Sequence, residues 1–206
     1  MKQKKLWMAL AFLAAFGLWT LAVKWVDVQP IGPLGSSVGF ATPNGFIHRM
    51  TGVHWALYDL TDRLSLIPLG FIAGFGVLGL VQWVRRRKLR RVDRSILVLG
   101  GFYLAVLAAF VLFEVFPVNF RPVLIDGVLE ASYPSSTTML AMCVMPTAAM
   151  ELRRRVRNKA LTFMIAAFTV FMVVGRLLSG VHWFTDIVGG GLLSIGLVRM
   201  YDFFNS

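Results

Sequence analysis

Residues 95–116 read SILVLGGFYLAVLAAFVLFEVF, a run of 22 residues in which Glu114 is the only charged side chain. A helix of this length crosses the hydrocarbon core of a bilayer, which takes about 20 mostly apolar residues. Comparable apolar runs recur along the chain, and they predict six transmembrane helices, at 6–24, 66–84, 95–116, 136–152, 160–178 and 183–201. The sequence therefore predicts a single all-α membrane domain over residues 1–206, with its motif-bearing core at about 95–201.

The composition supports this class of protein. Of 206 residues, 57% are hydrophobic and 15% are charged, and the mean hydropathy is +0.71. A soluble domain of this size would not bury so much apolar surface. Cys143 is the only cysteine, so neither an intrachain disulfide nor a thiolate metal site is expected. The first apolar run is followed by no small-residue cleavage pattern, and we interpret it as a retained signal anchor.

The basic residues predict the orientation in the membrane. Sixteen of the 21 Lys and Arg residues lie in short clusters beside the apolar runs: Lys2–Lys5, Arg85–Arg94, Arg153–Lys159 and Arg199. Six spans place all of these clusters on one side, and positive charge favours the cytoplasmic side. We therefore expect a multi-pass cell-membrane protein with both termini in the cytoplasm. The net charge of +11 is explained by topology, so no nucleic-acid partner is expected, and the oligomeric state is left open.

The longest connection outside the spans, residues 25–65, faces the extracytoplasmic side in this topology. It begins with Pro and Gly turn formers, and from Phe46 to Leu64 its apolar residues follow helical spacing. This pattern predicts an amphipathic helix in the outer interface between the first two spans.

A histidine and a carboxylate meet between the last two spans. His182 and Asp186 are four residues apart, so on a helix they share one face. A carboxylate that accepts the Nδ1–H of an imidazole fixes its tautomer and leaves Nε2 free as a base or nucleophile. Arg176 lies six residues earlier, and its planar guanidinium suits two phosphate oxygens.

A second polar group opens the fourth span. Pro134 is a favourable entry residue for a helix, and Ser135, Ser136 or Thr137 can cap it. The free backbone N–H groups of a helix start bind anions. Arg121, after the third span, adds a cation on the same face. Together with His182 these residues predict a pocket for a tetrahedral phosphate.

The order of these residues resembles the type 2 phosphatidic acid phosphatase (PAP2) superfamily over residues 114–190. Its most specific part is Arg-x5-His-x3-Asp, here Arg176, His182 and Asp186. The resemblance implies a six-helix lipid phosphatase that needs no metal or other cofactor and acts through a phosphohistidine on His182. It further implies that Asp186 orients the ring, while Arg121, Arg176 and the helix start at Ser135–Ser136 bind phosphate.

The chain departs from the family pattern at two positions. The family has a Lys seven residues before the Arg of Arg-Pro, where this chain has Glu114. Its second motif is Pro-Ser-Gly-His, whereas this chain has Thr137 in place of the His that usually protonates the leaving group. Either another group donates the proton, or the leaving group needs none, or the protein does not hydrolyse. His54 is a candidate donor, and Glu114, Asp126 and Glu130 are weaker ones.

These departures favour a lipid diphosphate, such as a polyprenyl diphosphate, over a phosphomonoester. A phosphate leaving group has a second pKa of about 6, whereas an alkoxide leaving group is about as basic as hydroxide. General acid catalysis is worth about 10²–10⁴-fold, and a phosphate leaving group depends on it least. The alternatives are a lipid phosphotransferase with the same intermediate, and a catalytically silent binder or transporter of phosphorylated lipids.

Overall fold

The structure is a computed structural model, and it describes residues 2–156 and 158–205. Helices dominate these residues, and the only extended pairing within them consists of isolated bridges. The α-helices, in chain order, are α1 (Lys2–Trp25), α2 (Ala41–Thr51), α3 (Trp55–Leu64), α4 (Leu66–Arg86), α5 (Arg94–Val115), α6 (Ser136–Arg155), α7 (Lys159–Leu178) and α8 (Phe184–Phe204). The all-α prediction is confirmed.

Each predicted span coincides with one long helix to within a few residues. Five segments are long and apolar enough to cross a membrane, with α3 and α4 counted together as Trp55–Arg86. Helix α6 falls outside this set because it is rich in Ser, Thr and Met and ends in Arg153–Arg155. Half of its side chains are buried against neighbouring helices, and a helix shielded in this way needs no continuous apolar surface. The crossing of the membrane by α6 stays a prediction.

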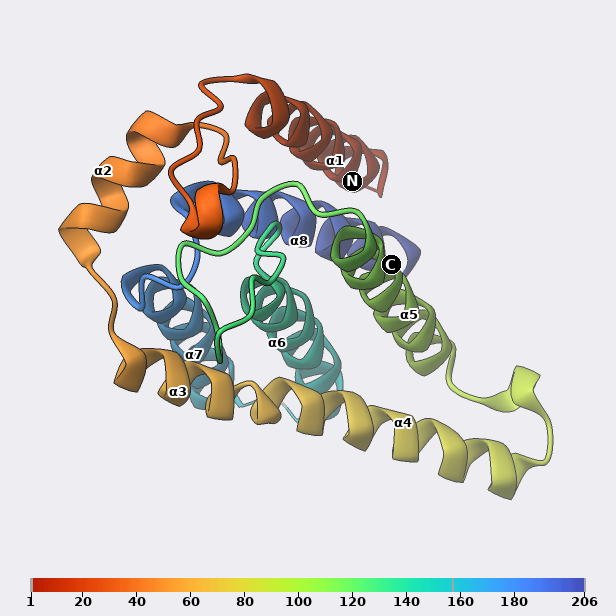
Figure 1. Cartoon of the computed structure of the whole chain (residues 1–206). Coiled ribbons are helices and arrows are strands. Elements are labelled where there is room, and N and C mark those ends of the chain that lie inside the picture. Colours follow the sequence, from red (N-terminus) through yellow and green to blue (C-terminus); the bar gives the residue numbers. More distant parts are fainter. Residues whose placement is uncertain (1, 157, 206) are drawn as a thin grey trace.

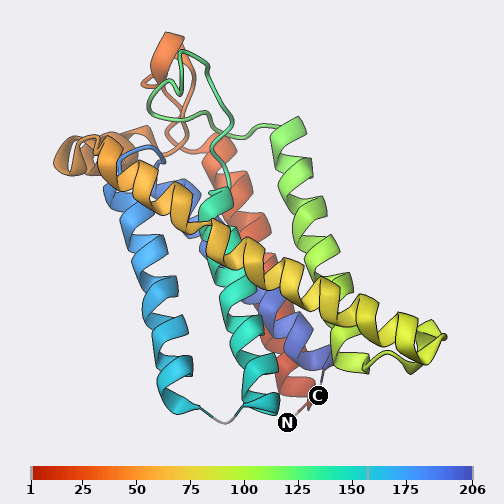
Figure 2. The ribbon, with the colours of Figure 1, turned by 90° about the horizontal axis from the view of Figure 1, so that it is seen from below.

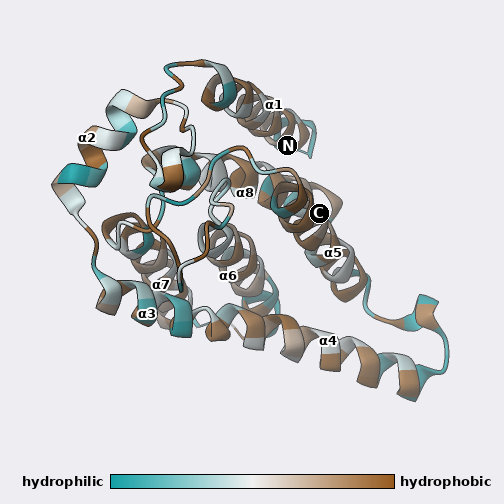
Figure 3. Ribbon diagram, viewed as in Figure 1, coloured by the Kyte–Doolittle hydropathy of each residue, from teal (hydrophilic) through white to brown (hydrophobic). Residues whose placement is uncertain are grey.

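The helices form one bundle with two distinct ends. Helices α1, α5, α6, α7 and α8 run side by side, and the α3–α4 pair crosses them obliquely (Figures 1 and 2). Both termini and the C-terminal end of α6 lie at one end, whereas α2 and loop 117–135 lie at the other (Figure 2). Hydrophobic residues dominate the long helices, while hydrophilic ones gather on α2, α3 and the connections (Figure 3).

Close helix contacts hold the bundle together. Leu99 and Phe102 of α5 pack with Met139 and Cys143 of α6 and with α8 in one hydrophobic core. At the end that carries the termini, the buried Glu151 accepts a hydrogen bond of 2.7 Å from the Tyr201 hydroxyl, which ties α6 to α8. The core thus fixes α6 and α8, the two helices whose starts carry the predicted site.

The prediction of one continuous amphipathic helix over residues 46–64 is wrong. The chain forms two helices there, α2 and α3, which are separated at Gly52. Gly52 has a φ of +68°, a conformation that glycine adopts without steric cost. Gly180, between α7 and α8, packs directly on this break, since a Cβ at Gly180 would lie 1.8 Å from the Gly52 carbonyl oxygen. The break therefore positions the connection that precedes His182.

Candidate active site

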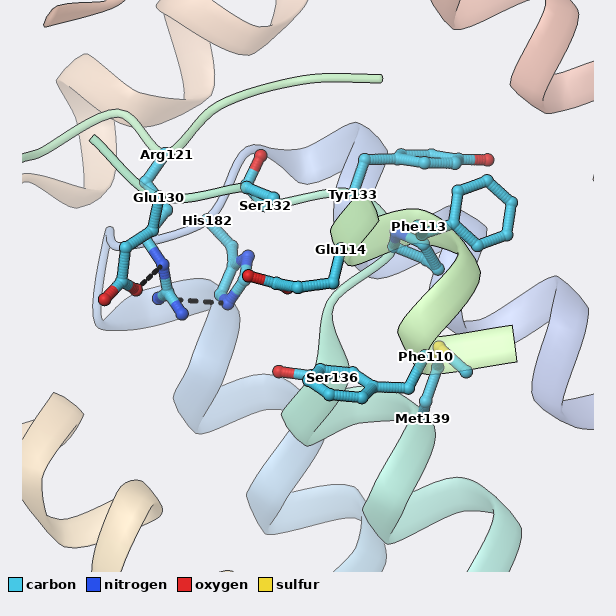
Figure 4. A pocket seen from close by; sticks show the side chains of 12 residues that line it. Phe110, Phe113, Glu114, Arg121, Glu130, Ser132, Tyr133, Ser136, Met139 and His182 are labelled. Atoms are coloured by element: carbon cyan, nitrogen blue, oxygen red, sulfur yellow. Dashed lines mark hydrogen bonds and ion pairs between the residues drawn. The ribbon is translucent and has the colours of Figure 1, made fainter. Parts of the chain in front are cut away.

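A polar cavity of about 210 Å³ lies at the end of the bundle opposite the termini. Four parts of the chain line it: the end of α5, loop 117–135, the start of α6 and the α7–α8 connection (Figure 4). The lining residues are Phe110, Phe113, Glu114, Arg121, Glu130, Ala131, Ser132, Tyr133, Pro134, Ser136, Met139 and His182.

His182 lies in the connection that leads from α7 to α8, and its side chain is buried. Helix α8 begins at Phe184, after His182, so the prediction that His182 and Asp186 share a helix face is wrong. The two side chains nevertheless lie together, with His182 Nδ1 3.6 Å from Asp186 Oδ2. This distance is longer than a hydrogen bond. Catalytic hydrogen bonds are often long in ligand-free structures and shorten when substrate binds.

Arg121 defines the tautomer of His182. Its Nη1 atom lies 3.4 Å from His182 Nε2. A guanidinium has only donors, so the hydrogen bond requires a lone pair on Nε2. The proton of the neutral ring is therefore on Nδ1, on the side of Asp186. The geometry thus presents the nucleophilic lone pair of Nε2 toward the cavity.

The surroundings of His182 also keep the ring neutral. Burial lowers the pKa of His182 well below its usual range, and the positive charges of Arg121 and Arg176 lower it further. A lowered pKa means that the neutral, nucleophilic form persists to more acidic pH than for an exposed histidine. A histidine that serves as a nucleophile requires this state.

Asp186 is held in place by hydrogen bonds from residues for which the sequence predicted no role. Its Oδ2 accepts a hydrogen bond of 2.9 Å from the Trp183 backbone N–H, and its Oδ1 accepts one of 3.5 Å from Asn119 Nδ2. Asn44 of α2 donates to the Thr185 hydroxyl at 2.9 Å. These buried polar residues tie α2 and loop 117–135 to the start of α8. The Trp-x-x-Asp spacing of Trp183 and Asp186, typical of a carboxylate that caps a helix start, was visible in the sequence, whereas the roles of the two asparagines were not.

Loop 117–135 folds back on itself and places Arg121 over His182. The Arg121 N–H donates to the Glu130 carbonyl at 3.0 Å, and the Ser132 N–H donates to the Asn119 carbonyl at 2.9 Å. Arg121 Nε also lies 3.0 Å from Glu130 Oε2, an ion pair visible in Figure 4. The Trp183 indole donates to the Phe120 carbonyl at 2.7 Å, which attaches the loop to α8.

The start of α6 forms a third wall. Ser135 is the N-cap, and its hydroxyl accepts the Thr138 N–H at 3.4 Å. The Ser135 N–H donates to the Asp186 carbonyl at 3.1 Å, so the two helix starts are joined. Ser136 lines the cavity, and backbone N–H groups in the first turn of a helix have no partner within the helix. The predicted helix start is therefore beside the imidazole, with Ser135 acting as a cap.

Three predicted site residues lie elsewhere. Arg176 is buried, but its guanidinium faces α3, where Nη1 donates to Thr61 Oγ1 at 3.1 Å. Thr137 is buried outside the cavity lining. His54 is exposed, and its Nε2 lies 2.8 Å from the Thr51 carbonyl oxygen at the α2–α3 break. The structure thus brings Arg121, Ser136 and His182 together in the cavity, whereas the Arg176 guanidinium is bound by α3.

Comparisons with known proteins match the part of the chain that carries these residues. Residues 115–205 match the PAP2 superfamily, a region that contains Arg121, the start of α6, His182 and Asp186. A segment is 35% identical over 79 residues to phosphatidylglycerophosphatase B of Bacillus subtilis (strain 168), and the match covers 34% of this chain but only 39% of that protein.

The fold agrees over almost the whole chain. The crystal structure of a transmembrane PAP2-type phosphatidylglycerolphosphate phosphatase from Bacillus subtilis superposes with a TM-score of 0.62. The superposition covers 97% of this chain and 96% of that one, at 18% identity. Helices of spanning length and this transmembrane fold make the chain a membrane protein. Residues 115–205 thus match the PAP2 superfamily, and the fold of the whole described chain resembles that of a PAP2-type enzyme.

Proposed function

We propose that this protein is a membrane lipid phosphatase whose reaction proceeds through a phosphohistidine on His182. One observation carries the proposal: Nε2 of a buried imidazole faces a cavity that also contains the Arg121 guanidinium and the start of α6. A guanidinium fork and the N-terminus of a helix are both suited to the oxygens of a phosphoryl group. The match of residues 115–205 to the PAP2 superfamily and the name of the Bacillus relative support the same class of reaction.

In this proposal the first half-reaction takes place at Nε2. The lone pair of Nε2 attacks phosphorus, the bond between phosphorus and the leaving oxygen breaks, and the positive charge of the imidazolium develops beside Asp186, whose Oδ2 is 3.6 Å from Nδ1. Arg121 and the start of α6 stabilise the negative charge on the transferred phosphoryl oxygens. No step in this sequence calls on a metal ion.

The preferred substrate in this proposal is a lipid diphosphate such as a polyprenyl diphosphate. Thr137 occupies the position of the proton-donating histidine, and it lies outside the cavity lining. A phosphate leaving group, with a second pKa of about 6, departs without a proton donor far more readily than an alcohol does. The lipid tail would remain in the bilayer, and the cavity would face the extracytoplasmic side, because the basic clusters lie at the other end of the bundle.

The test is phosphate release by the purified protein with a metal chelator present. The substrates are a polyprenyl diphosphate, phosphatidic acid and phosphatidylglycerophosphate, and the variants are wild type and His182→Ala. We expect faster release from the diphosphate than from either monoester, and none by the variant above background. Undiminished release by His182→Ala would remove the mechanism, whereas equal rates on all substrates would remove only the preference for diphosphates.

A further inference from the structure

The second half-reaction needs a group that the first does not use. Hydrolysis of a phosphohistidine requires a proton acceptor for the attacking water, within hydrogen-bond reach of it. His182 is blocked by phosphate at that stage. In Glu130, one carboxylate oxygen is 3.0 Å from Arg121 Nε. The Tyr133 hydroxyl is 2.7 Å from the Thr20 hydroxyl, at the far side of its ring. These contacts leave one acidic side chain of the cavity lining without a partner.

That side chain is Glu114, in the last turn of α5. It lines the cavity, and Figure 4 shows its carboxylate pointing toward the His182 imidazole. Among residues 2–156 and 158–205 it makes no hydrogen bond or ion pair, and it is exposed. The cavity therefore holds an accessible carboxylate whose oxygens are free to bind water.

The position of Glu114 is unfavourable for the helix itself. A negative charge in the last turn is opposed by the negative end of the helix dipole, at a cost that no partner in the described structure offsets. The residue also interrupts an otherwise uncharged run of 22 residues. Violations of local structural rules in a cavity point to functional residues.

We propose that Glu114 is the general base that activates water for hydrolysis of the phosphohistidine. This inference rests on the proposed reaction at His182. The water oxygen attacks phosphorus as one water proton passes to the Glu114 carboxylate. The bond between phosphorus and Nε2 breaks, and its electron pair returns to Nε2 while Nδ1 keeps its proton. The products are inorganic phosphate and neutral His182, and Glu114 then releases its proton to solvent.

The role of Glu114 as a base also agrees with the proposed preference for a substrate that has a good leaving group. A lipid diphosphate phosphorylates His182 without help from an acid, so the only proton transfer that needs a protein side chain is the one from water. The charged and titratable groups around Glu114 are Arg121 and Glu130 of loop 117–135, Tyr133 before α6, and His182. Arg121 is the cation among them, and it forms its ion pair with Glu130.

The test separates the two half-reactions. Wild type, Glu114→Gln, Glu114→Asp and Asp126→Asn are mixed with a polyprenyl diphosphate labelled in its terminal phosphate, and acid-labile label on the protein is followed with time. Asp126→Asn is the matched control, because Asp126 is an acidic residue of the neighbouring loop 117–135, makes no ion pair within the described residues and is outside the cavity lining. Thermal midpoints in detergent check that each variant is folded.

We expect Glu114→Gln to release about one equivalent of lipid monophosphate in a burst and then turn over about 10²–10⁴-fold more slowly than wild type. Its protein should retain label that wild type and Asp126→Asn do not accumulate, and Glu114→Asp should restore part of the turnover. Unchanged turnover in Glu114→Gln, or slower turnover without retained label, would overturn the role of Glu114. Phosphate release by His182→Ala would instead overturn the phosphohistidine, so the two failures are distinguishable.

Discussion

Replacement of Asp186 by asparagine tests the pairing of the imidazole with a carboxylate. Asparagine keeps the size of the side chain, and its Oδ1 still accepts the Trp183 N–H that Asp186 binds at 2.9 Å. The same oxygen position of Asp186, Oδ2, lies 3.6 Å from His182 Nδ1, so the asparagine oxygen still faces Nδ1 as an acceptor. The variant therefore removes the negative charge and keeps the tautomer that has its lone pair on Nε2.

The magnitude follows from the distance between the two side chains. Two unit charges 3.6 Å apart interact by about 4–5 kcal/mol at an effective dielectric constant of about 20. Loss of this stabilisation of the imidazolium would slow phosphorylation by about three orders of magnitude, since each 1.36 kcal/mol is about tenfold.

The assay is the single-turnover rate of protein labelling with a polyprenyl diphosphate. Asp126→Asn carries the same change of charge at a position outside the cavity, and we expect its rate to equal that of wild type. Asp186→Asn should label about a thousandfold more slowly, with a thermal midpoint close to that of the control. Labelling within tenfold of wild type would refute the assignment of Asp186 as the partner of the imidazole.

Three further predictions concern the surroundings of the cavity. Gly180→Ala should lower the thermal midpoint by several degrees, because its Cβ would lie 1.8 Å from the Gly52 oxygen at a φ of +70°, whereas Gly70→Ala, with nothing within 4 Å, should not. Because burial and two nearby guanidinium groups lower the pKa of His182, its ring should stay neutral as the pH falls through 6.5; ¹⁵N chemical shifts that show protonation at or above that pH would contradict this. His54→Ala should keep phosphate release within about twofold of wild type, since its ring lies on its own turn; a loss of 10²-fold or more would restore it as a proton donor.

The bundle was predictable because the membrane leaves few alternatives. Backbone groups in the hydrocarbon core must be paired within the segment, so an apolar run such as 95–116 becomes a helix whatever its neighbours are. The break at Gly52 was not predictable from periodicity. It depends on Gly180, which is far away in the sequence and packs against it. Local pattern therefore gave the long helices, and tertiary contact decided the short ones.

The site shows the same division. The spacing of His182 and Asp186 predicted that they are neighbours, and the cap residues at Ser135 predicted the start of α6. The direction of Arg176 was not accessible, because its partner Thr61 is 115 residues earlier in the chain. A motif gives the types of side chain that a site contains, but the packing of α3 against α7 decides which of them reach the cavity.

Arg121 links substrate binding to the exposure of the nucleophile. In the ligand-free protein it donates to His182 Nε2 at 3.4 Å and pairs with Glu130 at 3.0 Å, so it covers the lone pair that must attack phosphorus. Phosphoryl oxygens carry negative charge and accept stronger hydrogen bonds than a neutral imidazole does. We therefore expect an incoming phosphate to draw the guanidinium away from Nε2. Arg121 would then bind the substrate and free the lone pair of Nε2 in one movement. In the absence of substrate, the hydrogen bond from Arg121 would keep this lone pair from reacting.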